Sequence, residues 1–171
     1  NKYFVICVNS LGSCFGSTSP ASINKATGES YGLTFPELSI EDIAKSGHSV
    51  LQTLGIDHAH TVMGPSMGGM TALAYALLFP NSLSNLIVIS AAARALPFTI
   101  SIRSLQRELI RSDPLWNNGV YKKDSAPLNG MKLARKLGLM SYRAANEWRE
   151  RFNRARLPKS EDKKMLSLIH I

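Results

Sequence analysis

A glycine-flanked serine near the middle of the chain has the residue types and spacing of a catalytic nucleophile. Gly64-Pro65-Ser66-Met67-Gly68 fits the pattern G-x-S-x-G, between an apolar run at residues 60–63 and a segment rich in Ala, Leu and Met. In a strand–turn–helix context, a serine on this tight turn presents its Oγ outside the sheet. The N–H of the next residue lies at a helix N-terminus and can donate to an oxyanion. The motif therefore predicts Ser66 as the nucleophile and the Met67 backbone as an oxyanion donor; the alternative is an ordinary turn with a capping serine.

A serine nucleophile needs a general base, and the histidines of this chain do not supply one in the expected order. In strand–turn–helix sites of this kind the acid, and then the histidine, follow the serine in sequence. Three histidines precede Ser66 and are predicted to be surface or packing residues: His48, His58 and His60. His170 follows Ser66 but lies in the C-terminal tail, and the later aspartates fall in a predicted helical region. We therefore expect the catalytic Asp and His to be absent from this chain, which reads as the middle of an enzyme.

The elements that must position Ser66 read as a parallel sheet with helices between its strands. Apolar and β-branched runs predict buried strands over residues 3–9, 60–63 and 86–90. One helix is predicted to begin after Ser39, with Asp42 three residues on, and to end at Gly55, and another covers residues 67–79. A loop of roughly 25 residues, rich in Gly, Ser and Thr, follows the first strand, and loops of that length usually serve a function. This order predicts an α/β fold with right-handed crossovers.

The second half of the chain has helical patterns and no strand patterns. Helices are predicted over residues 100–112, 128–140 and 141–155. We interpret the chain as a partial α/β core with the serine turn over residues 1–94, and a helical lid region over residues 95–165. The last six residues, 166–171, read LSLIHI, which resembles the translation of a sequencing adapter, and we expect this tail to be non-native.

Length and composition bound the class of protein. The 171 residues are 44% hydrophobic and 19% charged, with a mean hydropathy of −0.04, which suits a globular domain with a core. The sequence contains no apolar run of ~18 residues and does not begin with a signal-peptide pattern. Cys7 and Cys14 form neither a zinc motif nor a disulfide framework. We expect no metal, no membrane association and a reducing, cytoplasmic compartment.

The charge is unevenly distributed. Residues 1–90 carry 3 basic and 5 acidic residues, a net charge of −2, whereas residues 91–171 carry 17 basic and 7 acidic residues, a net charge of +10. A basic half can attract nucleic acid, anionic lipid or a polyphosphate cofactor. We predict instead that most of these charges solvate helix faces. No nucleic-acid partner is expected, because the aromatic residues that base stacking would need do not cluster.

Five longer segments extend the argument beyond the serine motif. In chain order they are YFVICVNSLGSCFGSTSPASIN, YGLTFPELSIEDI, GPSMGGM, RALPFTISIRSLQRELIRSDPLWNNGVY and ARKLGLMSYRAANEWRERF. Together they resemble the homoserine and serine O-acyltransferases, the homoserine O-acetyltransferase type of α/β-hydrolase fold, over nearly all of residues 2–157. Within this family, the sequences of these segments are most similar to the serine O-succinyltransferase branch. The resemblance implies a fragment with a partial parallel sheet and a helical lid, lacking the N-terminal strands and the C-terminal catalytic part.

The resemblance also implies an activity. Ser66 would attack an acyl-CoA thioester in a ping-pong reaction, and the hydroxyl of L-homoserine or L-serine would then accept the acyl group, in methionine or cysteine biosynthesis. The donor would be acetyl-CoA or succinyl-CoA, used as a substrate, with no bound cofactor. The fragment alone is expected to be inactive, and a full-length chain could form a homodimer through the lid. The alternative is a serine esterase or thioesterase of the same fold.

Two substrate-binding residues follow from the resemblance alone. Arg135, in ARKLG, corresponds to the family residue that holds the amino-acid carboxylate, a role that suits a guanidinium. Tyr142, in SYR, corresponds to a second pocket residue. One local departure from the family lies in the long loop, where Ser19 occupies a position that usually carries Gly. That change either alters the backbone or marks a position that tolerates negative φ.

Overall fold

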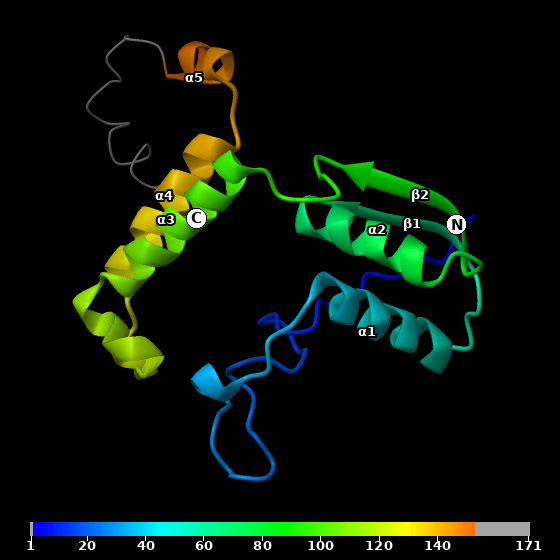
Figure 1. The fold of residues 1–171 in the computed structure, drawn as a ribbon, viewed down its shortest axis with the longest axis horizontal. Helices are drawn as coiled ribbons and strands as arrows, with labels where there is room; N and C mark the ends of the chain where they lie inside the picture. The colour runs from blue at the N-terminus through cyan, green and yellow to red at the C-terminus, as the bar shows by residue number, and fades with distance from the viewer. Residues whose placement is uncertain (1, 153–171) are drawn as a thin grey trace. The chain divides into compact units, whose positions relative to one another are not determined.

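A computed structural model describes residues 2–152 of the chain (Figure 1). The tail predicted to be non-native, residues 166–171, lies outside the described residues. The chain divides into two compact units, Asn1–Ala95 and Leu96–Ile171, and each is described by itself. In the part of the chain that the structure describes, no helix is long and apolar enough to cross a membrane.

The first unit contains a two-stranded parallel sheet with two helices. Strand β1 (Ala59–Pro65) pairs with β2 (Leu83–Ile89), in a register that aligns the first and last residues of the two strands. Helix α2 (Met67–Leu78) connects them and packs on both strands, and helix α1 (Ile40–Thr53) packs against α2 (Figure 1). The α/β class, the two strands and both helices predicted here from the sequence are confirmed.

The core of this unit is small and lies mainly between the two helices. Ala44 of α1 and Ala74 and Tyr75 of α2 are buried. Partly buried apolar side chains pack around them: Ile40, Leu51, Val62, Phe79 and Leu83. Small residues at positions 44 and 74 allow the helices to approach closely, so α2 is held between α1 and the sheet.

The start of α1 is fixed by its own sequence. The Ser39 side chain accepts from the Asp42 N–H at 3.1 Å, and the Asp42 carboxylate accepts from the Ser39 N–H at 3.0 Å. This reciprocal capping box satisfies two N–H groups that no helical carbonyl can reach. The same backbone hydrogen bond from Ser39 lowers the pKa of Asp42 below its usual value. The helix start predicted at Ser39 is therefore confirmed.

The strand predicted over residues 3–9 is wrong. This segment forms no strand, and Tyr3, Phe4 and Val5 are 55%, 80% and 85% exposed. The Tyr3 ring contacts the sheet, since its centroid lies 5.2 Å from that of the His60 ring on β1. An apolar, β-branched sequence shows that a segment suits a buried strand, but a ladder also needs a neighbouring strand edge. No such pairing forms among the described residues.

The long loop is ordered by turns. It contains a short 3-10 turn, η1 (Gly32–Thr34), and an isolated antiparallel bridge between Ile23 and Ser30. Ser19 is buried and its N–H donates to the Ser22 Oγ at 3.0 Å. Ser19 is not among the residues with positive φ. Of the two readings of this departure from the family, the structure supports a position that tolerates negative φ.

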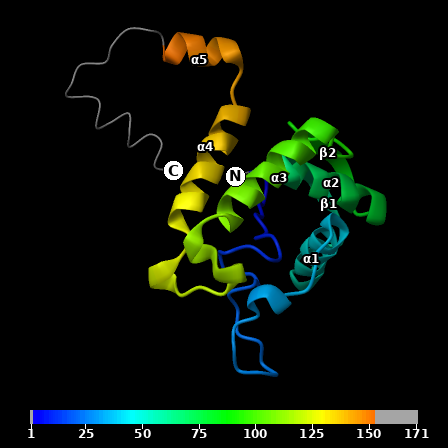
Figure 2. The same ribbon diagram turned by 60° about the vertical axis from the view of Figure 1, so that its left-hand side comes forward.

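The second unit is helical. Helices α3 (Pro97–Arg111) and α4 (Leu128–Ser141) lie side by side (Figure 2), joined through the short turns η2 (Pro114–Gly119) and η3 (Lys123–Ser125). Helix α3 begins three residues earlier than predicted because Pro97 suits the first helical turn. Helix α5 (Ala145–Arg151) begins four residues later than predicted, since α4 continues to Ser141.

Three small residues bring α3 and α4 together. Gly130, Ala134 and Gly138 recur every four residues on α4 and are buried. A Cβ on Gly130 would lie 2.5 Å from the Leu109 carbonyl oxygen and 2.8 Å from the Ile110 Cα. Both are backbone atoms of α3, which cannot move aside as a flexible side chain could. The helices therefore meet at a distance that only glycine permits at this position.

We expect Gly130→Ala to destabilise the helical unit by about 1–3 kcal/mol, because the added methyl must push the α3 backbone away. Urea unfolding of the full-length protein measures this loss. The matched control is Gly47→Ala in α1, where a Cβ meets nothing within 4 Å. That change should be neutral or stabilise by up to about 1 kcal/mol through helix propensity. Equal effects at the two positions would contradict the close approach of α3 and α4.

A buried carboxylate fixes the turn between these helices. Asp113 accepts from the Gly130 N–H at 2.7 Å and from the Leu115 N–H at 3.0 Å. Both hydrogen bonds lower the pKa of Asp113 below its usual 3.8, and the bond from the Gly130 N–H has the larger effect. Both bonds favour the ionised form, so protonation of Asp113 weakens the connection between η2 and the start of α4.

The stability of this unit should therefore depend on pH in the acid range. Because the folded-state pKa of Asp113 is depressed, its stabilisation is complete above the unfolded value of 3.8 and is lost as the pH falls through the folded value. Melting temperatures at pH 5 and pH 3 measure the loss. Asp113→Asn should melt lower at pH 5 and lose less between the two pH values. A variant with the same pH dependence as the parent protein would remove Asp113 from this role.

Candidate active site

Ser66 occupies a strained turn between β1 and α2. Its backbone has φ 52° and ψ −122°, a conformation that residues with a Cβ rarely adopt. The Ser66 N–H donates to the Ile89 carbonyl of β2 at 2.9 Å. Its own carbonyl accepts from the Gly69 and Met70 N–H groups of α2 at 2.9 and 3.2 Å. Strand and helix thus hold Ser66 from both sides, and strain of this kind is typical of functional sites.

Two glycines make the turn sterically possible. A Cβ on Gly64 would lie 2.3 Å from the Gly68 carbonyl carbon and oxygen. One on Gly69 would lie 2.6 Å from the Ala91 Cβ and 2.9 Å from the Gly64 carbonyl oxygen. Gly68 itself has room, since its nearest contact would be the Pro65 Cδ at 3.5 Å. The essential pair is therefore Gly64 and Gly69, one residue beyond the motif that the sequence singled out.

The Ser66 side chain is free to react. Ser66 is exposed, and its hydroxyl makes no capping hydrogen bond to the start of α2. This differs from an ordinary turn with a capping serine. Because Met67 is the first residue of α2, its backbone N–H is one of the first-turn N–H groups that have no partner within the helix. The turn thus presents a hydroxyl beside backbone N–H donors at the positive end of a helix.

The three histidines of the first unit are occupied elsewhere. The His48 Nδ1 lies 3.2 Å from the Tyr75 hydroxyl, and its ring stacks on Phe79 at 3.8 Å. Tyr75 is nine residues from Ser66 along α2, about 14 Å along the helix axis. His58 contacts the Asn81 carbonyl and the Ser84 hydroxyl at 3.0 and 2.8 Å.

His58 and His60 lie at the opposite end of the sheet from the nucleophile. His60 contacts the Thr61 hydroxyl at 2.8 Å, and it precedes Ser66 by six positions along the extended chain, about 20 Å. His58 precedes β1 and lies farther still. None of the three histidines can reach the Ser66 hydroxyl in this arrangement.

A second serine lies at the same edge of the sheet. The strand register aligns Pro65 with Ile89, so Ser66 and Ser90 follow at the carboxyl ends of neighbouring strands. Ser90 also has a positive φ, 49°. Ser90 carries no motif of its own in the sequence, because only the strand register brings it beside Ser66. Two strained backbone positions at one sheet edge identify that edge as the candidate active site of this unit.

Of the two predicted substrate-binding residues, Arg135 lies on α4 and Tyr142 caps the C-terminal end of that helix. Arg135 and Tyr142 are exposed and seven residues apart, so two helical turns place them on the same side. The Arg103 guanidinium of α3 lies over the Tyr142 ring, with its Cζ 5.9 Å from the ring centroid. This distance suits a cation–π contact. Arg103 could not be singled out from the sequence, because its contact with Tyr142 depends on how α3 and α4 pack.

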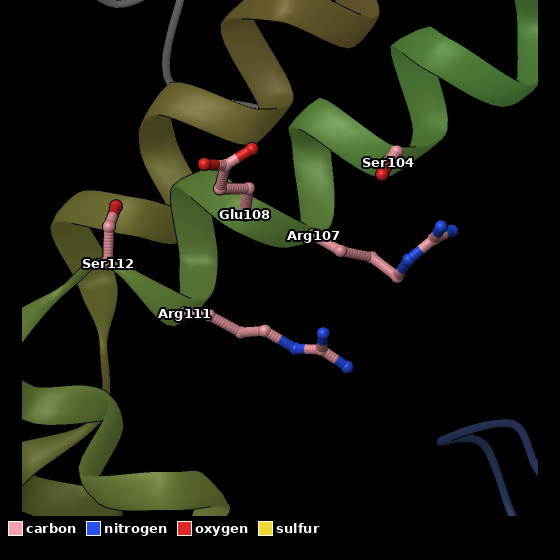
Figure 3. Close-up of a pocket in the computed structure, with 5 residues that line it drawn as sticks. All are labelled: Ser104, Arg107, Glu108, Arg111 and Ser112. Carbon is pink, nitrogen blue, oxygen red and sulfur yellow. The ribbon is translucent and has the colours of Figure 1, made fainter.

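A shallow hollow of about 440 Å³ lies on the outer face of α3 (Figure 3). Its lining residues all come from one stretch of chain: Ser104, Arg107, Glu108, Arg111 and Ser112. The Arg107 and Arg111 side chains extend from the helix into open space (Figure 3). The hollow has no second wall and contains none of the predicted site residues. Within residues 2–152, no cluster of side chains could hold a metal ion.

The fold and the serine turn define the class of protein. Residues 1–165 match the family described as the alpha/beta hydrolase fold, and the chain belongs to that family. Serine O-succinyltransferase from Litchfieldella anticariensis is 56% identical over 161 residues, which cover 94% of this chain and 44% of that protein. The Stenotrophomonas maltophilia K279a protein of the same name is 57% identical over 157 residues, 92% of this chain and 42% of that protein. The chain thus spans less than half the length of these curated relatives.

Solved structures give the same fold with two kinds of activity in their names. Homoserine O-acetyltransferase from Bacillus anthracis superposes with a TM-score of 0.80 at 27% identity, covering 90% of this chain and 44% of that one. Esterase E22 superposes with a TM-score of 0.74 at 28% identity, with the same coverage. The predicted α/β-hydrolase fold and the resemblance to homoserine and serine O-acyltransferases are confirmed.

Relief of strain at Ser66 should be measurable as stability. We expect Ser66→Gly to be more stable than Ser66→Ala by about 1 kcal/mol, because glycine adopts this backbone conformation without strain and loses part of that gain to chain entropy. Thermal unfolding of the two variants of the full-length protein measures the difference. A Ser66→Ala variant at least as stable as Ser66→Gly would show that the turn stores no strain.

Proposed function

We propose that the protein is an acyl-CoA-dependent O-acyltransferase that transfers a succinyl group to the hydroxyl of L-serine. The observation that carries this proposal is the strained, exposed Ser66 at the start of α2, in a chain 56% identical to a serine O-succinyltransferase. L-homoserine as the acceptor and acetyl-CoA as the donor are the alternatives that the sequence left open. The similar Bacillus anthracis structure is named homoserine O-acetyltransferase, so both L-homoserine and acetyl-CoA are included in the experiments below.

The reaction has two steps on one nucleophile. The Ser66 Oγ attacks the thioester carbonyl, the C–S bond breaks, and CoA leaves as a thiol after taking up the proton that Ser66 loses. The acceptor hydroxyl then attacks the resulting ester, its proton returns to the Ser66 oxygen, and the O-acyl amino acid leaves. Each step passes through an oxyanion, which the Met67 N–H stabilises as the bond to Ser66 forms and breaks. The helix N-terminus adds a favourable potential at the same point.

The proton transfers need a base, which we assign to segments that correspond to the remaining length of the relatives. His48, His58 and His60 are engaged in packing or lie far along β1. A histidine with its acid partner, following Ser66 in the chain, would complete the order used by this fold. On this proposal the 171-residue chain alone does not turn over.

Arg135 supports an amino-acid acceptor. Its guanidinium is exposed and can grip a carboxylate through two parallel hydrogen bonds. Tyr142, at the C-terminal cap of α4, follows two helical turns later on the same side, so its ring can bound the same pocket. Serine and homoserine differ by one methylene, a difference worth only ~1–3 kcal/mol in a pocket. The choice of serine therefore rests on the relatives' names.

Arg103 supports a donor with a free carboxylate. Succinyl-CoA carries such a group and acetyl-CoA does not. Among the described residues Arg103 is in no ion pair, and its guanidinium lies over the ring of Tyr142. A cation held in this way beside the proposed acceptor pocket suits the succinyl carboxylate. We assign Arg103 to the acyl donor and Arg135 to the acceptor.

A second candidate function is an esterase or thioesterase. Esterase E22 shares the fold over 90% of this chain. It would use Ser66 in the same first step, and water would replace the amino acid in the second. The two functions therefore differ only in what removes the acyl group.

Arg135→Ala separates these functions. We expect acylation of Ser66 by succinyl-CoA to be unchanged within about twofold, and the serine-dependent release of the acyl group to fall by tenfold or more, as for loss of a hydrogen-bonded charge. Mass spectrometry of the full-length protein measures acylation, and product formation measures release. Lys136→Ala, an exposed cation on the same helix, is the matched control, and Ser66→Ala should show no acylation.

Two outcomes would overturn these assignments. Loss of acylation in a folded Arg135→Ala protein would remove Arg135 from the acceptor site. Release that is equally fast with and without L-serine or L-homoserine would favour the hydrolase.

A further inference from the structure

Gln106 on α3 bonds to both sides of the contact between α3 and α4. Its Oε1 accepts from the Arg103 Nη1 at 2.5 Å, and its Nε2 donates to the Ala134 carbonyl at 2.8 Å. The orientation of the amide is unambiguous, because a guanidinium can only donate and a carbonyl can only accept. One side chain thus connects Arg103 to the backbone immediately before Arg135.

The close packing of α3 on α4 places the Gln106 amide against Gly138 of α4. A Cβ on Gly138 would lie 2.8 Å from the Gln106 Nε2. Ala134, whose carbonyl receives the hydrogen bond, is buried. On the other side of Arg103, its guanidinium lies over the Tyr142 ring. The guanidinium is therefore held on one side by an amide oxygen and on another by an aromatic face.

Because the Gln106 amide is neutral, it can hold Arg103 without cancelling the positive charge of the guanidinium. A carboxylate at position 106 would hold Arg103 as well, but it would cancel the charge. The unit does use carboxylates elsewhere, since Glu147 pairs with both Arg143 and Arg151. The Gln106 amide orients Arg103 through one of its five N–H donors and leaves the positive charge for a ligand.

We propose that Gln106 is a positioning residue that fixes Arg103 against Tyr142, and thereby sets the preference for an acyl donor with a free carboxylate. The proposal rests on the transferase function and on the assignment of Arg103 to the acyl donor. It goes further in naming the group that makes Arg103 selective. Gln106 itself touches no substrate in this proposal.

Two variants of Gln106 test the idea in the full-length protein. Gln106→Glu keeps the shape and the contact with Arg103, but it neutralises Arg103 and sets an oxygen against the Ala134 carbonyl. Gln106→Met keeps the length and removes both hydrogen bonds. For each we measure kcat and KM with succinyl-CoA and with acetyl-CoA, which lacks the carboxylate.

We expect KM for succinyl-CoA to rise about tenfold in both variants, as for a weakened hydrogen bond to a charged group. KM for acetyl-CoA and kcat with either donor should stay within about twofold. The preference for succinyl-CoA, as the ratio of kcat/KM values, therefore falls about tenfold. Arg107→Gln is the matched control, since it changes the net charge as Gln106→Glu does, on an exposed side chain of the same helix (Figure 3). It should leave the preference unchanged.

A purely structural role gives a different result. If Gln106 only braces α3 against α4, both donors lose activity together, the melting temperature falls, and the preference is unchanged, which overturns the proposal. A further variant, Arg103→Ala, tests the assignment of Arg103 to the acyl donor separately from the transferase function. An unchanged preference in Arg103→Ala, with Ser66 still acylated, refutes the donor assignment and this inference but leaves the transferase. A parent protein that neither CoA thioester acylates refutes the proposed function itself.

Discussion

The close approach of β1 to the start of α2 is the constraint on which the rest of the first unit depends. Ser66 can adopt its strained backbone only because Gly64 and Gly69 let the strand and helix meet at backbone contact distance. The Ser66 N–H is then tied to β2 and its carbonyl to α2. The strain is supported by hydrogen bonds on both sides, so the hydroxyl and the helix N-terminus are already oriented before a substrate binds. Preorganisation of this kind is what oxyanion stabilisation requires.

Features decided by neighbouring residues could be predicted from the sequence. The capping box at Ser39 involves residues three apart, and the serine motif involves five consecutive residues, so each carries its own signal. The strand predicted over residues 3–9 shows where that reasoning ends, because a ladder needs a partner that local sequence does not reveal. The same limit explains why Gly69 was missed as the second essential glycine. Its neighbour Ala91 lies beyond β2, and only the packed structure brings the two together.

The residues of the candidate site also fall into two groups: those that a local motif or a family resemblance indicates, and those that only helix packing brings together. Ser66 and Met67 lie in one local motif, and Arg135 and Tyr142 came from resemblance to a family. Arg103 and Gln106 had no such signal beyond a spacing of three residues, which suits a contact on one helix. Their relation to Ala134 and Tyr142 follows from the glycine-lined contact between α3 and α4. A sequence shows that these residues are small or polar, but it does not show which helix they face.

The difference between a transferase and a hydrolase of this fold lies away from the nucleophile. Both need Ser66, its strained turn and an oxyanion donor, so none of these features separates them. A transferase must also hold two substrates in turn, and each proposed substrate here carries a carboxylate. In the helical unit, Arg103 is held by a neutral amide and lies over the Tyr142 ring, and neither Arg103 nor the exposed Arg135 forms an ion pair among the described residues. Water needs no such cations, so the proposed roles of Arg103 and Arg135 are what separate acyl transfer from hydrolysis.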